Sequence, residues 1–147
     1  MDCQEALTTR RGVLRYDPRP VEPELIEQVL AAAVAAPSPA NLQPWAFVVV
    51  TEPELAVRTA RYLLDVQDRR VFQEFLGLRP EETGRYIGLY DLFENAPCFI
   101  VVCNEPKARF ALPEHEGVLR DWTLMCLGAA IGNLMAAATA LGLGTRW

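Results

Sequence analysis

The chain has 147 residues, of which 51% are hydrophobic and 22% are charged, so a disordered chain is excluded and one domain over residues 1–147 is expected. The formal net charge is −5, and lysines and arginines occur in no run longer than a pair. A nucleic-acid partner is therefore not expected, because phosphate-backbone binding depends on clustered cations. No charged leader followed by an apolar core opens the chain, so we expect no secretion signal and a cytoplasmic protein.

The cysteines do not indicate a metal site. Their spacing fits neither CxxC nor a common zinc pattern, and His115 is the only histidine. The favoured interpretation is that they are small buried thiols in a reducing compartment. They are Cys3, Cys98, Cys103 and Cys126.

Two helix starts are visible near the beginning of the chain. Asp2 and Glu5 form a capping-box pattern, which predicts a short helix from Cys3 to about Thr9. A proline between two glutamates at 22–24 predicts the start of an amphipathic helix of about three turns, ended by Pro37.

Between these helices lies a cluster of cations. Arg10, Arg11 and Arg15 fall within six residues, beside a turn that contains Gly12. Fork-shaped guanidinium groups can bind a phosphate in such a place. A solvated basic surface is the competing interpretation, and the pattern alone leaves both open.

The segment 36–50 combines a polar loop with an apolar strand. Pro37 and Pro39 cannot continue a helix, and Asn41 and Gln43 carry amides that both donate and accept hydrogen bonds. Residues 45–50 are aromatic and β-branched, which predicts a strand buried on both faces. A rigid polar loop that opens into a buried strand can hold a ligand, and an ordinary helix-to-strand connection is equally consistent.

The middle of the chain gives weaker signals. Residues 51–54 resemble a second capping box, so 55–64 should be helical. Two weaker helical segments are expected within 65–93, and 98–103 reads as a second buried strand. Residues 107–120 show no clear period and are expected to be a surface segment.

The last element is an apolar helix over Trp122–Leu141, with Asp121 as a candidate cap. Gly142 and Gly144 follow it and predict its C-cap. Such a helix must be buried on all sides, which one small domain rarely achieves, so we expect a subunit interface. A membrane span is the alternative, and it is disfavoured because alanines and glycines dominate the segment and the rest of the chain has a soluble α/β pattern. Small residues at i, i+4 spacing form one ridge that suits close helix contact: Gly128, Gly132, Ala136 and Ala140.

Taken in order, four segments resemble the nitroreductase family of flavoproteins. The most specific is the one that ends in Asn41-Leu-Gln-Pro-Trp45. The segments are Thr9–Asp17, Ala36–Phe47, Ala96–Cys103 and Gly128–Trp147.

The resemblance implies an α+β, nitroreductase-like fold, with a central β-sheet flanked by helices. It further implies an intertwined homodimer through the Trp122–Leu141 helix, with FMN at the subunit interface. Because family members continue past Trp147, the C-terminal part of the family fold is expected to be absent from these 147 residues.

The activity implied is an FMN-dependent oxidoreductase that passes electrons from NADH or NADPH to a small acceptor such as a nitroaromatic or a quinone. The flavin carries the redox chemistry, so no catalytic side chain and no metal are expected. The alternative is a non-catalytic dimeric scaffold that binds flavin or has lost it.

The resemblance also implies a set of cofactor-binding residues. Arg10 would clamp the FMN phosphate, and the loop at 38–41 would reach the flavin of the other subunit. The sequence departs from the family pattern at two positions: Gly12 replaces the usual serine, and Leu14 replaces a second cation. The missing cation at Leu14 and the short C-terminus favour the non-catalytic alternative. The implied set is Arg10, Arg11, Gly12, Arg15, Ser38, Pro39, Asn41 and Trp147.

Overall fold

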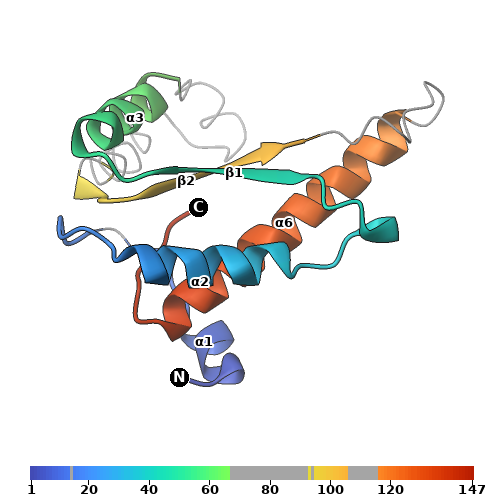
Figure 1. The fold of residues 1–147 in the computed structure, drawn as a ribbon, viewed down its shortest axis with the longest axis horizontal. Helices are drawn as coiled ribbons and strands as arrows, with labels where there is room; N and C mark the ends of the chain where they lie inside the picture. The colour runs from blue at the N-terminus through green and yellow to red at the C-terminus, as the bar shows by residue number, and fades with distance from the viewer. Residues whose placement is uncertain (14, 67–92, 94, 106–115) are drawn as a thin grey trace, which may run out of the picture. The chain divides into compact units, whose positions relative to one another are not determined.

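A computed structural model describes residues 1–13, 15–66, 93, 95–105 and 116–147 (Figure 1). Most of the two weak helices expected within 65–93, and residues 107–115 of the expected surface segment, lie outside this part. The described elements are α1 (Cys3–Thr9), α2 (Pro23–Val34), the 3-10 turn η1 (Pro39–Asn41), β1 (Trp45–Val50), α3 (Pro53–Val66), β2 (Phe99–Asn104) and α6 (Glu116–Ala140).

The chain divides into two compact units. The first combines Met1–Gly12, Glu22–Val48 and Ile100–Trp147, and it contains α1, α2, η1 and α6. The second combines Val13–Val21 and Val49–Phe99, and it contains α3.

The two N-terminal helices begin where the sequence predicts. The Asp2 carboxylate accepts a hydrogen bond from the Glu5 amide at 2.8 Å, which caps α1. Helix α2 has Pro23 in its first turn and buries Ile26, Val29 and Ala33 on one side. The predicted N-cap at Asp2 and the predicted amphipathic helix are both confirmed.

Helix α3 begins with a different cap from the one expected. The side chain of Glu52, not Thr51, accepts hydrogen bonds from the amides of Glu54 at 3.1 Å and Leu55 at 2.7 Å. The capping-box interpretation of 51–54 was therefore wrong. The helix starts one residue later than that pattern requires, which leaves Glu52 at the capping position. The longer carboxylate can then reach the free amides of the first turn.

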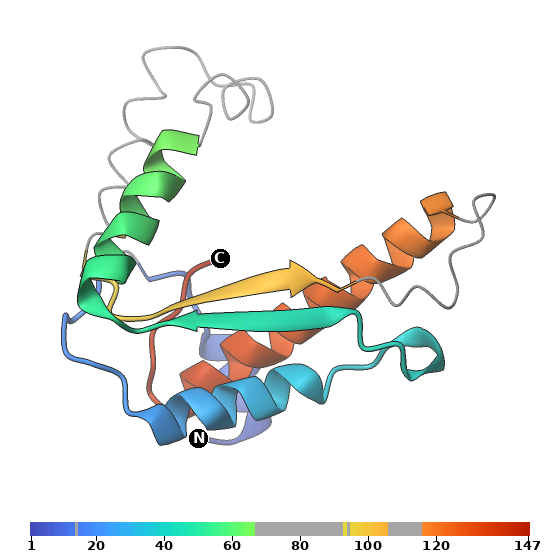
Figure 2. The ribbon, with the colours of Figure 1, turned by 45° about the horizontal axis from the view of Figure 1, so that its top comes forward.

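Strands β1 and β2 form a two-stranded sheet in the described part of the chain. The Glu105 amide, just after β2, donates to the carbonyl of Pro44, just before β1, at 2.9 Å. The start of one strand therefore faces the end of the other, which makes the pair antiparallel; the arrows in Figure 2 run in opposite directions. Strand β2 covers 99–104, one residue later than predicted.

Only one face of this sheet is covered by the helices of the first unit. Trp45 and Phe47 of β1 and Ile100 of β2 pack against the buried residues of α2 and α6. On the other face, Val48 is 53% exposed and Val101 is 43% exposed. The register set by the Pro44–Glu105 bond places these two valines opposite each other.

The predictions that 45–50 is buried on both faces and that 98–103 is a second buried strand were therefore wrong for the face that carries Val48 and Val101. The apolar runs at 45–50 and 98–103 contain no polar residue that would mark an outer face. Because both faces of the strands carry apolar side chains, the sequence shows no alternation of apolar and polar residues that would indicate an exposed face.

Helix α6 begins at Glu116, so residues 116–120 are helical, and the expectation of a non-helical segment up to 120 was wrong there. Asp121 lies inside the helix, and it is not the cap. Its carboxylate lies 3.6 Å from the Arg120 guanidinium, with both side chains largely exposed. Glu, Leu and Arg are good helix formers, which explains why the helix extends through 116–120 despite Gly117.

Helix α6 crosses α2 (Figure 1), and it contacts the α2 side of the layer through one stripe of buried residues. Its buried residues recur every fourth position: Cys126, Ala130, Leu134 and Ala138. They contact Val29, Ala33 and Ala36 from the α2 side of the layer. Gly128 and Gly132 are each two residues away from the nearest positions of this buried stripe, so they lie on the opposite side of the helix.

The rest of α6 is not buried in the protomer. Side chains in its N-terminal half are largely exposed: Val118, Trp122, Leu124 and Met125. The residues from Gly117 to Ala140 form the one helix in the described part that is long and apolar enough to cross a bilayer, with mean hydropathy 1.5. That criterion rests on length and composition, and core helices of globular proteins also meet it.

The end of α6 returns the chain toward the N-terminal segment. Gly142 has φ +79, the Leu143 amide donates to the Ala138 carbonyl at 2.8 Å, and the Gly142 amide donates to the Thr139 carbonyl at 3.0 Å. This is a Schellman motif, which confirms the predicted C-cap. Beyond it, Thr145 forms a parallel bridge with Gly12.

Candidate functional site

The loop between α2 and β1 is closed by its own hydrogen bonds. The Asn41 amide donates to the Ser38 carbonyl at 3.0 Å, and the Leu42 amide donates to the Pro39 carbonyl at 3.0 Å. The Gln43 amide donates to the Ser38 hydroxyl oxygen at 3.0 Å. The Ser38 side chain therefore holds the loop together, and its hydroxyl hydrogen can still be donated to a ligand.

The loop also carries unusual backbone angles. Ala40, Asn41 and Gln43 have φ values of +49, +52 and +46. The left-handed region costs an ordinary residue about 1–2 kcal/mol, and such strain concentrates at ligand-binding segments. Asn tolerates this region better than Ala or Gln does. The loop is thus held in a shape that its sequence does not favour.

Both ends of the loop are fixed to other elements of the first unit. Before the loop, the Asn133 side chain of α6 donates to the Ala32 carbonyl of α2 at 3.2 Å. After the loop, the Pro44 carbonyl accepts from the Glu105 amide, and Trp45 is only 6% exposed against α6. The exposed Asn41 therefore projects from a well-anchored turn.

The arginine segment follows the end of α1. The Arg11 guanidinium donates to the Thr8 carbonyl at 2.9 Å and to the Arg10 carbonyl at 2.8 Å. Carbonyls at a helix C-terminus lack intrahelical partners and carry partial negative charge, so a cation stabilises them. Arg11 therefore caps α1, whereas the partly buried Arg10 side chain forms no hydrogen bond or ion pair with the described residues.

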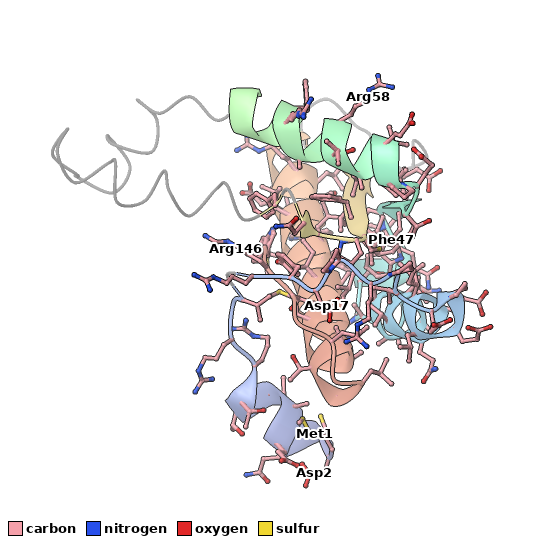
Figure 3. All side chains as sticks on the ribbon, turned by 90° about the vertical axis from the view of Figure 1, so that its left-hand side faces the viewer. Met1, Asp2, Asp17, Phe47, Arg58 and Arg146 are labelled. Carbon is pink, nitrogen blue, oxygen red and sulfur yellow. The ribbon has the colours of Figure 1, made fainter. Side chains whose placement is uncertain are left out.

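The C-terminal segment lies directly beside this arginine segment. The bridge between Gly12 and Thr145 joins them, and Figure 3 labels the adjacent Arg146. The Thr145 hydroxyl oxygen is buried and has no hydrogen-bond partner in the described structure. A buried hydroxyl without a partner costs free energy, so it is a position where a polar ligand group would be favoured.

Sequence reasoning missed Thr145. The only signal was its place directly after the Gly142–Gly144 turn, which was interpreted as a helix end alone. The hydroxyl becomes notable only when the fold brings it beside Gly12.

The structure groups the predicted site residues in two places. Arg10, Arg11 and Gly12 lie with the C-terminal segment, whose last residue, Trp147, is 84% exposed. The loop that follows the C-terminal end of α2 carries Ser38, Pro39 and Asn41, whereas the first group lies near the N-terminal end of that helix (Figures 1 and 2).

Two further positions of the arginine motif are Leu14 and Arg15. Arg15 is exposed and belongs to the second unit. Leu14, where the family resemblance led us to expect a cation, lies outside the described residues.

The prediction of buried thiols is confirmed for Cys126 alone, since Cys98 and Cys103 are only partly buried and Cys3 is exposed. Burial raises the pKa of the Cys98 and Cys126 thiols, which disfavours the reactive thiolate. Cys3 is exposed on α1. Among the described residues, no group of His, Cys, Asp and Glu side chains could hold a metal ion. His115 lies outside the described part.

Comparison with known families gives a match over residues 7–147 to the model of the nitroreductase family. The chain belongs to the nitroreductase family. A relative from Archaeoglobus fulgidus, named "Putative NADH dehydrogenase/NAD(P)H nitroreductase", is 32% identical over 146 residues, which cover 99% of this chain and 66% of the relative. An iodotyrosine deiodinase from Haliscomenobacter hydrossis is 29% identical, over 91% of this chain and 60% of that protein.

Solved structures confirm the nitroreductase fold. A BluB-like flavoprotein from Clostridium difficile 630 superposes with a TM-score of 0.73 at 25% identity, and the match covers 100% of this chain and 74% of that one. An FMN-bound nitroreductase from Bacteroides fragilis gives a TM-score of 0.66 at 23% identity, over 100% and 69% of the two chains. This nitroreductase-family chain spans between 60% and 66% of the curated relatives that it matches first.

Proposed function

We propose that this chain is part of an FMN-dependent oxidoreductase that transfers electrons from NADH or NADPH to a small acceptor. The family assignment supports an oxidoreductase, and solved relatives are described as a flavoprotein and as FMN-bound. The observation that carries the proposal is the Gly12–Thr145 bridge. It sets a buried hydroxyl without a partner beside the segment that bears Arg10.

These residues suit the phosphate end of FMN. The Arg10 guanidinium would supply a charge-assisted contact to the phosphate, and the Thr145 hydroxyl would donate to a phosphate or ribityl oxygen. Arg11 already caps α1, so it would contribute little beyond its charge.

The loop at 38–41 would bind the flavin ring, which is the end of the cofactor opposite the phosphate. The Asn41 amide can donate and accept, as a flavin ring edge requires. Because this loop and the arginine segment lie at opposite ends of α2, we infer that the two groups act on one cofactor across a homodimer. The exposed side of α6 at Gly128 and Gly132, where an added Cβ meets no atom within 4 Å, would form the contact between subunits.

When bound, FMN would supply the redox chemistry itself, and the protein would bind it, orient it and exclude water. No side chain is expected to act as an acid or a base. Nitroaromatics and quinones are the acceptors that we expect. The single-domain organisation and the cytoplasmic, membrane-free location remain predictions.

The test is a purified and dialysed sample of the whole protein. We expect a flavin absorbance band that bleaches with NADH or NADPH under anaerobic conditions and returns on addition of a quinone or nitroaromatic. Replacement of Thr145 by Val keeps the shape and removes the hydroxyl, so it should lower FMN affinity several-fold, whereas Thr139→Val should not. A protein that binds no FMN even on titration would favour the non-catalytic scaffold.

A further inference from the structure

Helix α6 is apolar along most of its length, yet its C-terminal half contains the polar residue Asn133. The Asn133 Nδ2 donates to the Ala32 carbonyl of α2 at 3.2 Å, across 101 residues of sequence. The side chain is exposed, so burial does not dictate this polar contact. The role of this hydrogen bond follows from the position of its acceptor, the Ala32 carbonyl oxygen.

The Ala32 carbonyl lies in the last turn of α2. A continuing helix would pair it with the Ala36 amide, but that amide donates instead to the Ala33 carbonyl at 3.1 Å. Helix ends leave such carbonyls without intrahelical partners. The Asn133 side-chain amide, which belongs to α6, supplies the missing hydrogen-bond donor, and it therefore caps the C-terminal end of α2.

The residues that follow this cap lead directly into the candidate site. Ala36 is 7% exposed and packs with Cys126 and Ala130 of α6, one to two turns before Asn133. Ser38 comes two residues later and begins the hydrogen-bonded loop. Helix α6 thus fixes both the end of α2 and the start of the loop.

We infer that Asn133 is a positioning residue for the cofactor loop. By holding the last turn of α2, it keeps the strained backbone of Ala40, Asn41 and Gln43 in one conformation. Asn133 touches no cofactor in this scheme and acts through the loop. The inference about ligand binding rests on the proposed function, whereas the inference about loop order does not.

The first experiment measures loop order in the protein without flavin. Asn133→Leu removes the donor at an exposed position and keeps the side-chain size. We expect amide hydrogen exchange at Asn41, Leu42 and Gln43 to accelerate at least fivefold relative to wild type. Thr139→Ala is the matched control, since its hydroxyl bonds only the Met135 carbonyl of the same helix, at 2.9 Å.

Unchanged exchange at the three loop amides would overturn the inference. Uniformly faster exchange along α2, α6 and the loop would also overturn it, because this would indicate a purely structural role. If Asn133→Leu does not fold, Asn133→Asp serves instead. A carboxylate cannot donate to the Ala32 carbonyl at pH 7 but can when protonated, so loop protection factors should be low at pH 7 and recover at acidic pH.

The second experiment titrates FMN and riboflavin into the flavin-free variant. Because the loop would contact the ring rather than the phosphate, Asn133→Leu should weaken both ligands by a similar factor of at least three. Combined with Asn41→Gly, the losses should be smaller than the product of the single losses, because both act through one loop. Multiplicative losses, or a loss for FMN alone, would refute the positioning role. If wild type binds neither ligand, the proposed function fails while the exchange result still stands.

Discussion

The Gln43 amide donates to the Ser38 hydroxyl oxygen at 3.0 Å, across the loop that joins α2 to β1. This one bond ties the first polar residue of the loop to its last. It also lets Gln43 keep a positive φ of 46, which glutamine rarely adopts. The first prediction follows from it.

Replacing Ser38 by Ala should loosen the loop, because the Gln43 amide loses its acceptor, at a cost of about 1 kcal/mol. We expect faster amide exchange at Gln43 and a several-fold weaker affinity for FMN and riboflavin alike. Thr59→Ala in α3 is the control, since it removes a hydroxyl that bonds only the Leu55 carbonyl. Normal exchange at Gln43 in the Ser38 variant would show that the bond is dispensable.

The second prediction concerns Asn41, whose φ of +52 makes the choice of substitution decisive. Asn41→Ala should lower both flavin affinity and stability of the flavin-free protein, since alanine in the left-handed region costs about 1 kcal/mol more. Asn41→Gly removes the amide and accepts the backbone angle, so it should reduce flavin affinity and leave thermal unfolding nearly unchanged. An Asn41→Gly protein with full flavin affinity would identify Asn41 as a turn residue only.

The third prediction separates the arginines by fluorescence titration with FMN, with riboflavin as the phosphate-free ligand. Arg10→Ala should weaken FMN at least tenfold, since a charge-assisted contact contributes about 1.5–3 kcal/mol, and should leave riboflavin nearly unchanged. Arg11→Ala should have little effect on FMN and should instead destabilise α1. Arg15→Ala should be intermediate. Equal losses for both ligands in the Arg10 variant would exclude phosphate recognition.

The fourth prediction tests the homodimer by sizing chromatography. Gly132→Leu should shift the protein toward monomer, because overpacking a close contact costs about 1–3 kcal/mol at each site. Within the protomer an added Cβ at Gly132 meets no atom within 4 Å, so folding itself should not suffer. Gly132→Ala is the matched control, with better helix propensity and little added bulk. A wild-type protein that is already monomeric at micromolar concentration would contradict the proposed interface.

The fifth prediction concerns thiol alkylation at pH 8. Burial raises the pKa of Cys126, so less of this thiol is ionised at a given pH than for an ordinary cysteine. Because the thiolate is the nucleophile, Cys126 should react with iodoacetamide far more slowly than the exposed Cys3. Denaturant should abolish the difference, and the sites are read by mass spectrometry. Rapid labelling of Cys126 in the folded protein would contradict its place in the α2–α6 core.

Several features of the fold could be predicted because their signals are local. Asp2, Pro23 and Gly142 act within one turn of their own positions, through a side-chain cap, a fixed φ and an accessible positive φ. The order of motifs around Asn41 was enough to indicate the nitroreductase family. Similarly, the apolar composition of Trp122–Leu141 was enough to predict a long helix there.

Other features depend on neighbours that are distant in sequence, and only the tertiary structure decided them. Val48 and Val101 face outward because the helices of the first unit cover the opposite side of the sheet. Thr145 meets Gly12 only after α6 has returned the chain to its beginning. In the sequence, Asn133 is an isolated polar residue of an apolar helix. In the structure it lies beside the end of α2, where the Ala32 carbonyl lacks a partner within its own helix. Local chemistry sets where elements begin and end, whereas packing decides which of their groups remain available for a ligand.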